Sequence, residues 1–378
     1  MEYITVKELF KITKGKKVEE IDYKNENSIR YIQIDDLRNN NNIKHCENIN
    51  KYVIAKKEDI IIAWDGANAG TIGFGIEGAI GSTLAILRKE NKEMDTEFCG
   101  LFLRSKSAYL REKCTGATIP HIQRRALEDI KIPKISLNKQ IEIKNIINKA
   151  QELIDKRKEQ IQDLDELVKS QFIEMFGDIK NNPIGWEKIK IGDVFEIKTG
   201  ATPSRKENKY WDNGTIPWIK TTELKEIVIN NSEEYITEEG FNKSSVNLLP
   251  KNTLLIAMYG QGKTRGMTGK LGIEATTNQA CAAILPNPKE NMDFIWYQLK
   301  LSYEDLRDLG RGGSQPNLNT NLIKSYQLIF PPMELQNKFV QFTKQVDKLK
   351  FEMEKSLKEL EDNFNALMQK AFNGELFN

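Results

Sequence analysis

The stretch LNKQIEIKNIINKAQELIDKRKEQIQDLDELVKSQFIEMF, residues 137–176, decides the fold because a second version of it stands at residues 333–372. Matched positions are a constant 196 residues apart, as with Gln140 and Gln336 or Phe176 and Phe372. Apolar residues recur at spacings of three and four in both copies, with no Gly or Pro inside either run. This period is typical of an amphipathic helix with a heptad seam. Each copy therefore predicts a helix about 60 Å long.

A narrow apolar seam on a long helix needs a second helix to cover it. The other copy is the obvious partner, so we predict an intramolecular, antiparallel coiled coil. The alternative is two unrelated surface helices on separate cores, which the constant offset disfavours. The residues expected along the seam are Ala150, Leu153, Ile161, Leu164, Val168, Val346, Leu349, Leu357, Leu360 and Phe364.

The repeat extends into the blocks that precede the two helices. Residues 6–15 resemble 191–200 at an offset of 185, and the offset grows to 196, so the second block has longer loops. Short apolar runs bounded by turn residues predict buried strands, and spaced apolar residues predict helices. The predicted fold class is α+β, with two β-rich blocks and two long helices in a pseudo-twofold repeat. The expected strands are 60–63, 254–257 and several within 71–87, the expected block helices are 97–113 and 293–309, and the expected domains are 1–135, 136–178, 179–332 and 333–378.

Composition narrows the class of protein. The 378 residues are 29% charged and 39% hydrophobic, without a run of about 18 apolar residues that could span a membrane. Four cysteines and two histidines lack the spacing of a zinc site, so we expect a reducing cytoplasm, no disulfides and no structural metal. The blocks are net +3 and +2 and the helical stretches net −2 and −1. A polyanion would therefore meet the blocks and not the helices.

Two glycine-containing loops follow the predicted buried strands and raise the question of a cofactor. Residues 65–70 could suggest an S-adenosylmethionine or dinucleotide loop, but the spacing fails that motif and strands are expected to follow. Residues 257–264 are one residue away from a phosphate-binding P-loop, with Ala257 where the first Gly is required. No methyltransferase, nuclease or helicase motif is present: Ile329-Phe-Pro-Pro332 lacks the Asn of an amine-binding tetrapeptide.

The same loops suit contact with nucleic acid. Arg and amide side chains match base edges in the major groove, and Lys and backbone amides match phosphate. Loops after residues 14, 199, 123 and 311 carry similar side chains; the alternative for each is an ordinary solvated loop. The candidate DNA-binding residues are Lys14, Lys16, Lys17, Trp64, Asn68, Gln123, Arg124, Arg125, Thr199, Arg205, Lys220, Tyr259, Gln261, Lys263, Arg265, Arg311, Gln315 and Asn317.

Two β-rich blocks, each followed by a long helix, resemble the specificity subunit of type I restriction-modification systems over nearly the whole chain. The most specific parts are Gly116-x-x-x-Pro120 with Gly312-x-x-x-Pro316, and Phe330-Pro-Pro-Met-Glu-Leu-Gln336 at the start of the second helix. The first repeat departs from the pattern at Ser136, where Pro is expected. The family has no universal base-reading motif, so the resemblance assigns no base contact.

The resemblance implies a non-catalytic subunit that binds double-stranded DNA. Each block would be a target-recognition domain for one half of a bipartite site, and the helices would act as spacer. Two methyltransferase subunits would dock on the helices and restriction subunits would join them. S-adenosylmethionine, ATP and Mg²⁺ would belong to those partners, and this chain would need no cofactor. A protein-interaction scaffold, or a nucleotide-binding enzyme that uses residues 262–264, remain the alternatives.

Overall fold

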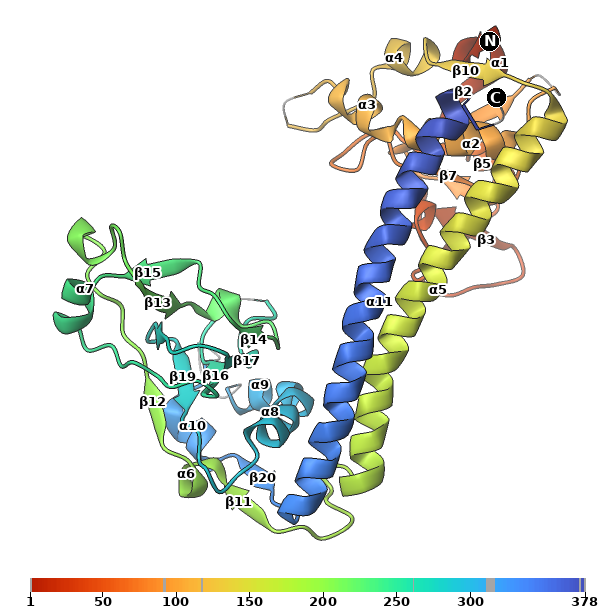
Figure 1. Ribbon diagram of the computed structural model, residues 1–378. Coiled ribbons are helices and arrows are strands. Elements are labelled where there is room, and N and C mark those ends of the chain that lie inside the picture. Colours follow the sequence, from red (N-terminus) through yellow and green to blue (C-terminus); the bar gives the residue numbers. More distant parts are fainter. Residues whose placement is uncertain are drawn as a thin grey trace. The chain divides into compact units, whose positions relative to one another are not determined.

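The computed structural model describes residues 2–90, 93–116, 118–260, 262–310, 317–373 and 375–376. The chain forms two compact units. Unit 1 comprises Met1–Glu159 with Glu354–Asn378, and unit 2 comprises Gln160–Met353. Each unit holds one β-rich block and a part of each long helix, α5 (Leu137–Phe176) and α11 (Met333–Asn373) (Figure 1). The four-domain division of the sequence stays a prediction.

The block of unit 1 is built from two four-stranded sheets, in the orders β2-β9-β6-β7 and β4-β3-β8-β5, and the antiparallel pair β1-β10. Helices α2 and α3 follow β9, and α4 precedes β10. The strands are β1 (Glu2–Thr5), β2 (Phe10–Lys14), β3 (Ser28–Ile32), β4 (Lys44–Glu47), β5 (Ile54–Ala55), β6 (Ile60–Ala63), β7 (Ile72–Phe74), β8 (Gly78–Ile80), β9 (Leu84–Lys89) and β10 (Lys131–Lys134). The helices are α1 (Val6–Leu9), η1 (Asp35–Leu37), α2 (Thr96–Ser105), α3 (Ser107–Glu112) and α4 (Arg124–Glu128).

The block of unit 2 repeats this plan with longer connections. Its sheets have the orders β12-β19-β16-β17-β14 and β15-β13-β18, with the pair β11-β20. The strands are β11 (Lys188–Lys190), β12 (Ile197–Thr199), β13 (Ile216–Ile219), β14 (Val228–Ile229), β15 (Glu234–Ile236), β16 (Leu254–Ala257), β17 (Thr268–Leu271), β18 (Thr276–Thr277), β19 (Cys281–Ile284) and β20 (Gln327–Ile329). The helices are α6 (Ile191–Val194), η2 (Asn208–Tyr210), η3 (Thr221–Glu223), α7 (Glu238–Asn242), α8 (Met292–Leu301), α9 (Tyr303–Leu309) and α10 (Thr320–Ser325).

The two predicted buried strands, β6 and β16, each lie between two cores. Successive side chains of a strand point to opposite faces. In β6, Ile60 and Ile62 enter one core while Ile61 enters another. In β16, Leu254 and Leu255 divide in the same way. All four residues of each strand are buried, which explains why the sequence is apolar throughout and does not alternate.

The long helices pair in antiparallel fashion within each unit, as predicted. In unit 1, Lys158 of α5 forms an ion pair with Glu361 of α11 at 2.8 Å. In unit 2, the Asp165 carboxylate of α5 accepts a hydrogen bond from Lys350 of α11 at 2.6 Å. Further along α5, the Phe172 ring lies 5.4 Å from the ring of Phe339, which is earlier in α11, so the two helices run in opposite directions. The buried seam is continuous with the core of the adjacent block in both units. The intramolecular coiled coil of the predicted α+β fold is therefore confirmed.

The seam differs from the prediction at two equivalent positions. Leu153 and Leu349 are each 47% exposed, and Ile154 is buried in place of Leu153. A straight helix has 3.6 residues per turn, so its buried face drifts away from a strict seven-residue repeat. Of the other predicted seam residues, Leu164, Val168 and Val346 are buried, and Ala150, Ile161, Leu357, Leu360 and Phe364 are partly buried.

The repeated glutamine at the start of each long helix ties that helix to its block. Gln140 is fully buried and donates from Nε2 to the carbonyl of Ile135 at 2.7 Å. Gln336 is buried as well and donates to the carbonyl of Pro331 at 2.8 Å. Because each acceptor lies five residues before its glutamine, the same bond holds the β-to-helix turn in both repeats.

Each predicted block helix is in fact two helices. The helix predicted at 97–113 corresponds to α2 and α3, which meet at Lys106. The helix predicted at 293–309 corresponds to α8 and α9, which meet at Ser302. The ψ angles of Lys106 and Ser302 are 5° and 11°, so the helical path bends there, and the apolar spacing alone cannot show this bend.

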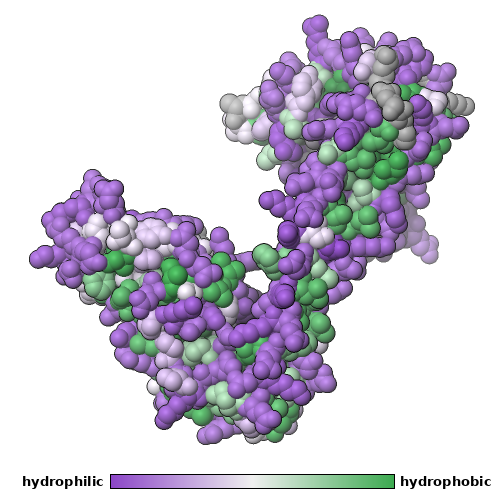
Figure 2. Space-filling view, in the orientation of Figure 1, coloured by the Kyte–Doolittle hydropathy of each residue, from purple (hydrophilic) through white to green (hydrophobic). Residues whose placement is uncertain are grey.

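Hydrophilic residues cover most of the visible face of each unit in Figure 2. Within the described residues, no helix has the length and apolar character needed to cross a membrane.

Candidate nucleic-acid interface

In unit 1, three loop segments meet at one edge of the sheet. Strand β9 pairs with β2 on one side and β6 on the other, so Lys14 lies opposite Ala85 and Ala63 opposite Leu84. The loops after β2 and β6 therefore leave the sheet together. The segment 120–122 joins them, because the amide of Ile122 donates to the carbonyl of residue 64 at 2.9 Å. The three loops proposed from the sequence are thus neighbours in unit 1.

Unit 2 builds the same edge. Thr199 lies opposite Ala282 and Ala257 opposite Cys281, which places the ends of β12 and β16 side by side. The amide of Leu318 donates to the carbonyl of residue 258 at 3.0 Å, so the segment after α9 reaches this edge too. We call residues 64–71 the first reading loop and residues 258–260 with 262–267 the second reading loop.

A repeated glycine allows the chain to cross closely at each edge. A Cβ on Gly15 would lie 2.2 Å from the carbonyl oxygen of Gly81. A Cβ on Gly200 would lie 1.9 Å from the carbonyl oxygen of Thr277. Both contacts are far below a van der Waals distance and both involve backbone, which cannot swing aside. This requirement explains why the two repeats share Gly at the ends of residues 6–15 and 191–200.

The first reading loop carries several of the candidate residues in fixed positions. Lys14 pairs with Asp65 at 2.8 Å, and Asn68 accepts from Arg38 at 2.7 Å. Trp64 is partly buried against the core, so its ring is held in place. Lys16, Lys17 and Gln123 are exposed. Arg124 and Arg125 are exposed as well and form ion pairs with Glu128 and Asp129.

The second reading loop presents different groups. Tyr259 is 40% exposed, and Lys263, Thr199 and Asn317 are exposed as well. Arg265 differs from the expectation of a surface guanidinium, because it is only 9% exposed. Its neighbour Gly266 turns with φ of +84° and packs on α9, which draws the end of the loop inward. The candidates Gln261, Arg311 and Gln315 lie outside the described residues.

Arg205 and Lys220 are held by a cluster that the sequence did not reveal. The Arg205 guanidinium lies 3.6 Å from the ring centre of Trp211, a cation–π contact. It also pairs with Glu234, which Lys220 approaches to 2.8 Å. The hydrogen bond from Arg205 lowers the pKa of the Glu234 carboxyl, and the bond to Glu234 raises the pKa of Lys220. Both cations are thus held in place by the Glu234 carboxyl.

Neither reading loop has the surroundings of a nucleotide-phosphate cradle. The first is followed by β7 and the second by β17. A P-loop or dinucleotide loop runs into a helix whose N-terminus holds the phosphate. The loops join strands instead, which is the geometry of a surface hairpin.

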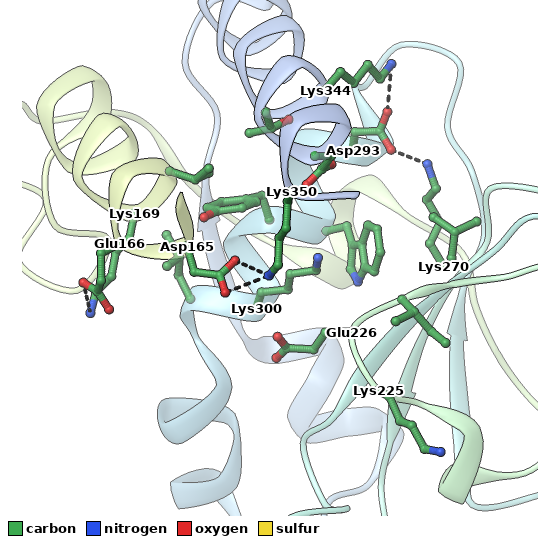
Figure 3. A pocket seen from close by; sticks show the side chains of 18 residues that line it. Asp165, Glu166, Lys169, Lys225, Glu226, Lys270, Asp293, Lys300, Lys344 and Lys350 are labelled. Carbon is green, nitrogen blue, oxygen red and sulfur yellow. Dashed lines mark hydrogen bonds and ion pairs between the residues drawn. The ribbon is translucent and has the colours of Figure 1, made fainter. Parts of the chain in front are cut away.

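A separate, charged cavity of about 740 Å³ in unit 2 lies between the block and the long helices (Figure 3). Lys300 points into it and stacks on Trp296 at 3.7 Å. Burial lowers the pKa of Lys300 and raises the pKa of the Glu226 and Asp347 carboxyls. The counterpart of Lys300 in unit 1 is Arg104, which lies over Phe74 at 4.7 Å. In each block a cation thus lies over an aromatic ring of the same block, with different residues in the two units.

The fold and the two loop edges together define a class of protein: a duplicated recognition protein that presents different side chains on two copies of one scaffold. The chain belongs to the family described as the type I restriction modification DNA specificity domain, which matches residues 1–165 and 183–362. It therefore carries two DNA specificity domains, in agreement with the two repeats.

Individual relatives agree with this assignment. The type I restriction enzyme MjaVIII specificity subunit of Methanocaldococcus jannaschii is 25% identical over 99% of this chain and 92% of its own length. The MjaIX specificity subunit of the same organism is 32% identical over 43% of this chain and 38% of its own.

Solved structures share the fold. A chain from a study of complex assembly and conformational transition in the type I restriction-modification system has a TM-score of 0.64 and 16% identity. That similarity covers 99% of this chain and 98% of the other. The S subunit of a type I system from M. genitalium has a TM-score of 0.57 and 18% identity, covering 98% and 96% of the two chains.

Proposed function

We propose that this chain is the sequence-reading, non-catalytic subunit of a cytoplasmic type I restriction-modification complex. The blocks of units 1 and 2 are the two target-recognition domains, and each reads one half of a bipartite site in double-stranded DNA. The paired helices set the spacing of the halves and dock two methyltransferase subunits, which restriction subunits join. S-adenosylmethionine, ATP and Mg²⁺ are bound by those partners.

One observation supports this proposal above the others. Both units bring the same set of loops to the same sheet edge, yet the side chains there differ. The first edge offers a Lys14–Asp65 pair and the Asn68 amide, and the second offers Tyr259 and Lys263. Equivalent scaffolds with different polar groups suit the reading of two different half-sites, because loops carry the binding residues of a conserved scaffold.

The proposal is tested by methylation mapping. The chain is combined with its methyltransferase partner, and methylated positions are located on genomic DNA. We expect a split consensus of two short sequences with a fixed gap. Methylation of a single continuous sequence, or salt-insensitive assembly with proteins in the absence of any DNA affinity, would contradict the proposal and favour a scaffold.

Lys263→Ala tests the second reading loop. We expect weaker binding to all DNA sequences and a slope of log K against log salt reduced by about one, the effect of losing one phosphate contact. Fluorescence anisotropy of the complex across a salt series measures both quantities. Lys355→Ala, on an exposed face of α11, is the matched control and should leave the slope unchanged. An unaltered slope for Lys263→Ala would remove this lysine from the interface.

Leu153 and Leu349 offer equivalent apolar contacts for two equivalent partners. Each is 47% exposed at the same position of its repeat, and exposed Leu at one position of both copies suits a partner present twice. We expect Leu153→Glu or Leu349→Glu to weaken one methyltransferase site about tenfold and the double variant to weaken both. Native mass spectrometry counts the bound subunits.

The control for this pair is Phe351→Glu. Phe351 is 64% exposed, but its counterpart in the first repeat, Asp155, is already charged. A surface shared by both repeats therefore does not include this position, and docking should be unaffected. Full occupancy of both sites by the Leu153→Glu, Leu349→Glu variant would place docking elsewhere.

A further inference from the structure

Two side chains of α9 hold the backbone of the second reading loop. Nη1 of Arg307 donates to the carbonyl of Gly262 at 2.9 Å and to the carbonyl of Arg265 at 3.1 Å. The Tyr303 hydroxyl donates to the carbonyl of Lys263 at 2.6 Å. Nη1 of Arg307 also donates to the Tyr303 hydroxyl at 2.8 Å, so the two side chains act together. Three loop carbonyls are thus fixed by one helical turn.

A cavity lies beside the second reading loop, so the loop conformation depends strongly on these hydrogen bonds. A cavity of about 550 Å³ is lined by Lys263, Tyr303 and Arg307, together with Lys225 and Met267. A loop next to a cavity has less side-chain packing to define its path. Its conformation therefore depends on polar contacts, which are directional and are lost singly when a donor is removed.

The first reading loop is supported in another way. Ala69 is buried in the core of unit 1, and a Cβ on Gly70 would already be 3.2 Å from the carbonyl oxygen of Ser107. The positions equivalent to Tyr303 and Arg307, at the offset of 196, are Ser107 and Arg111. Ser is too short to reproduce the tyrosine contact, and Arg111 is exposed. The first loop rests on direct packing against α3.

We propose that Tyr303 and Arg307 are positioning residues that set the conformation of the second reading loop and so determine specificity at the second DNA half-site. This inference rests on the proposed function, because it takes the loop to read DNA. The two residues act through the loop backbone, and the loop side chains contact DNA. We call Tyr303 and Arg307 the clamp. The clamp acts on recognition of the second half-site alone.

The test uses the full chain assembled with its methyltransferase partner. The wild-type consensus is mapped first, and DNA duplexes are then made with single-base changes in either half-site. Methylation rates on each duplex are compared for Arg307→Gln, Arg307→Lys and Tyr303→Phe. Arg111→Gln, the equivalent change in unit 1, is the matched control, and thermal unfolding is followed for every variant.

For Arg307→Gln we expect discrimination against wrong bases to fall about tenfold at the second half-site and to be unchanged at the first, since more than one hydrogen bond is lost. Tyr303→Phe, which removes one oxygen atom, should give a smaller fall, and Arg307→Lys an intermediate one. Arg111→Gln should behave as wild type. Wild-type discrimination in Arg307→Gln and Tyr303→Phe, or an equal fall at both half-sites, overturns the clamp.

The outcomes separate this inference from the proposed function. If the wild-type complex shows no dependence on a second half-site, the proposed function fails and the clamp fails with it. If the wild type reads both halves and the variants read the second half as well as the wild type does, only the clamp fails.

Discussion

Phe176→Ala is expected to lower the free energy of unfolding of unit 2 by about 3–5 kcal/mol, the cost of removing a large buried ring and leaving a cavity. Phe176 is fully buried where α5 ends, and its ring lies 5.0 Å from those of Phe172 and Phe294 and 5.7 Å from that of Phe339. These rings come from α5, α8 and α11, so one side chain joins the helical pair to the block. Hydrogen exchange followed by mass spectrometry should show faster exchange throughout unit 2.

The repeat supplies the matched variant for this experiment. Phe372 is the counterpart of Phe176 and packs against Phe98 at 5.7 Å and Phe102 at 5.1 Å in unit 1. Phe372→Ala should therefore accelerate exchange in unit 1, with a similar loss of stability. Leu153→Ala, at a half-exposed position, should cost far less. If Phe176→Ala left exchange in α8 and the end of α5 unaltered, the ring cluster would not hold that core together.

The sequence predicted the parts of this fold that depend on local periodicity. The spacing of apolar residues in 137–176 and 333–372 was enough to predict α5, α11 and their pairing. The unbroken apolar runs that became β6 and β16 were enough to predict buried strands. The drift that exposes Leu153 was not predicted, because it depends on how a straight helix lies on its partner over several turns.

The structure brings together the loops that the sequence analysis named, and their binding of DNA stays a prediction. In each block the two loops leave the sheet at the same edge because their strands flank, and pair antiparallel with, one shared strand, β9 or β19. The repeat showed that the loops are equivalent, but it could not show this strand order.

The hydrogen bonds and the cation–π contact that hold individual side chains in place were not predicted. Arg307 donates to the carbonyl of Gly262, which lies 45 residues earlier in the chain. Trp211 lies close to Arg205 in sequence, but neither residue stands in a stretch with a repeated signal. The burial of Arg265 was not predicted either, because it depends on the packing of its neighbour Gly266 against α9, which lies far along the chain.

Gly200→Ala is expected to abolish reading of the second half-site, with a loss in affinity for the full site of about 30-fold or more, a value typical of losing one or two base-pair contacts. The added Cβ would lie 1.9 Å from the carbonyl oxygen of Thr277, and the amide of Ala201 donates to that same oxygen at 3.0 Å. The strand end must therefore move away and release this bond. Because Thr199, Gly200 and the second reading loop share one edge, the displacement reaches the residues that we propose to face DNA.

Gly15→Ala is the corresponding change in the first block, where the added Cβ would meet the carbonyl oxygens of Gly81 and Ile80 at 2.2 and 2.7 Å. Each variant is measured by anisotropy on three duplexes: the full site, and the site with either half replaced. Gly200→Ala should bind the full site no better than the wild type binds DNA without the second half, and should keep its preference for the first. Gly15→Ala should show the reverse pattern. A steric change confined to one unit can alter only the DNA contacts made by that unit. If both variants lost recognition of the same half-site, or if each variant still recognised both half-sites, the two edges would not be independent reading surfaces.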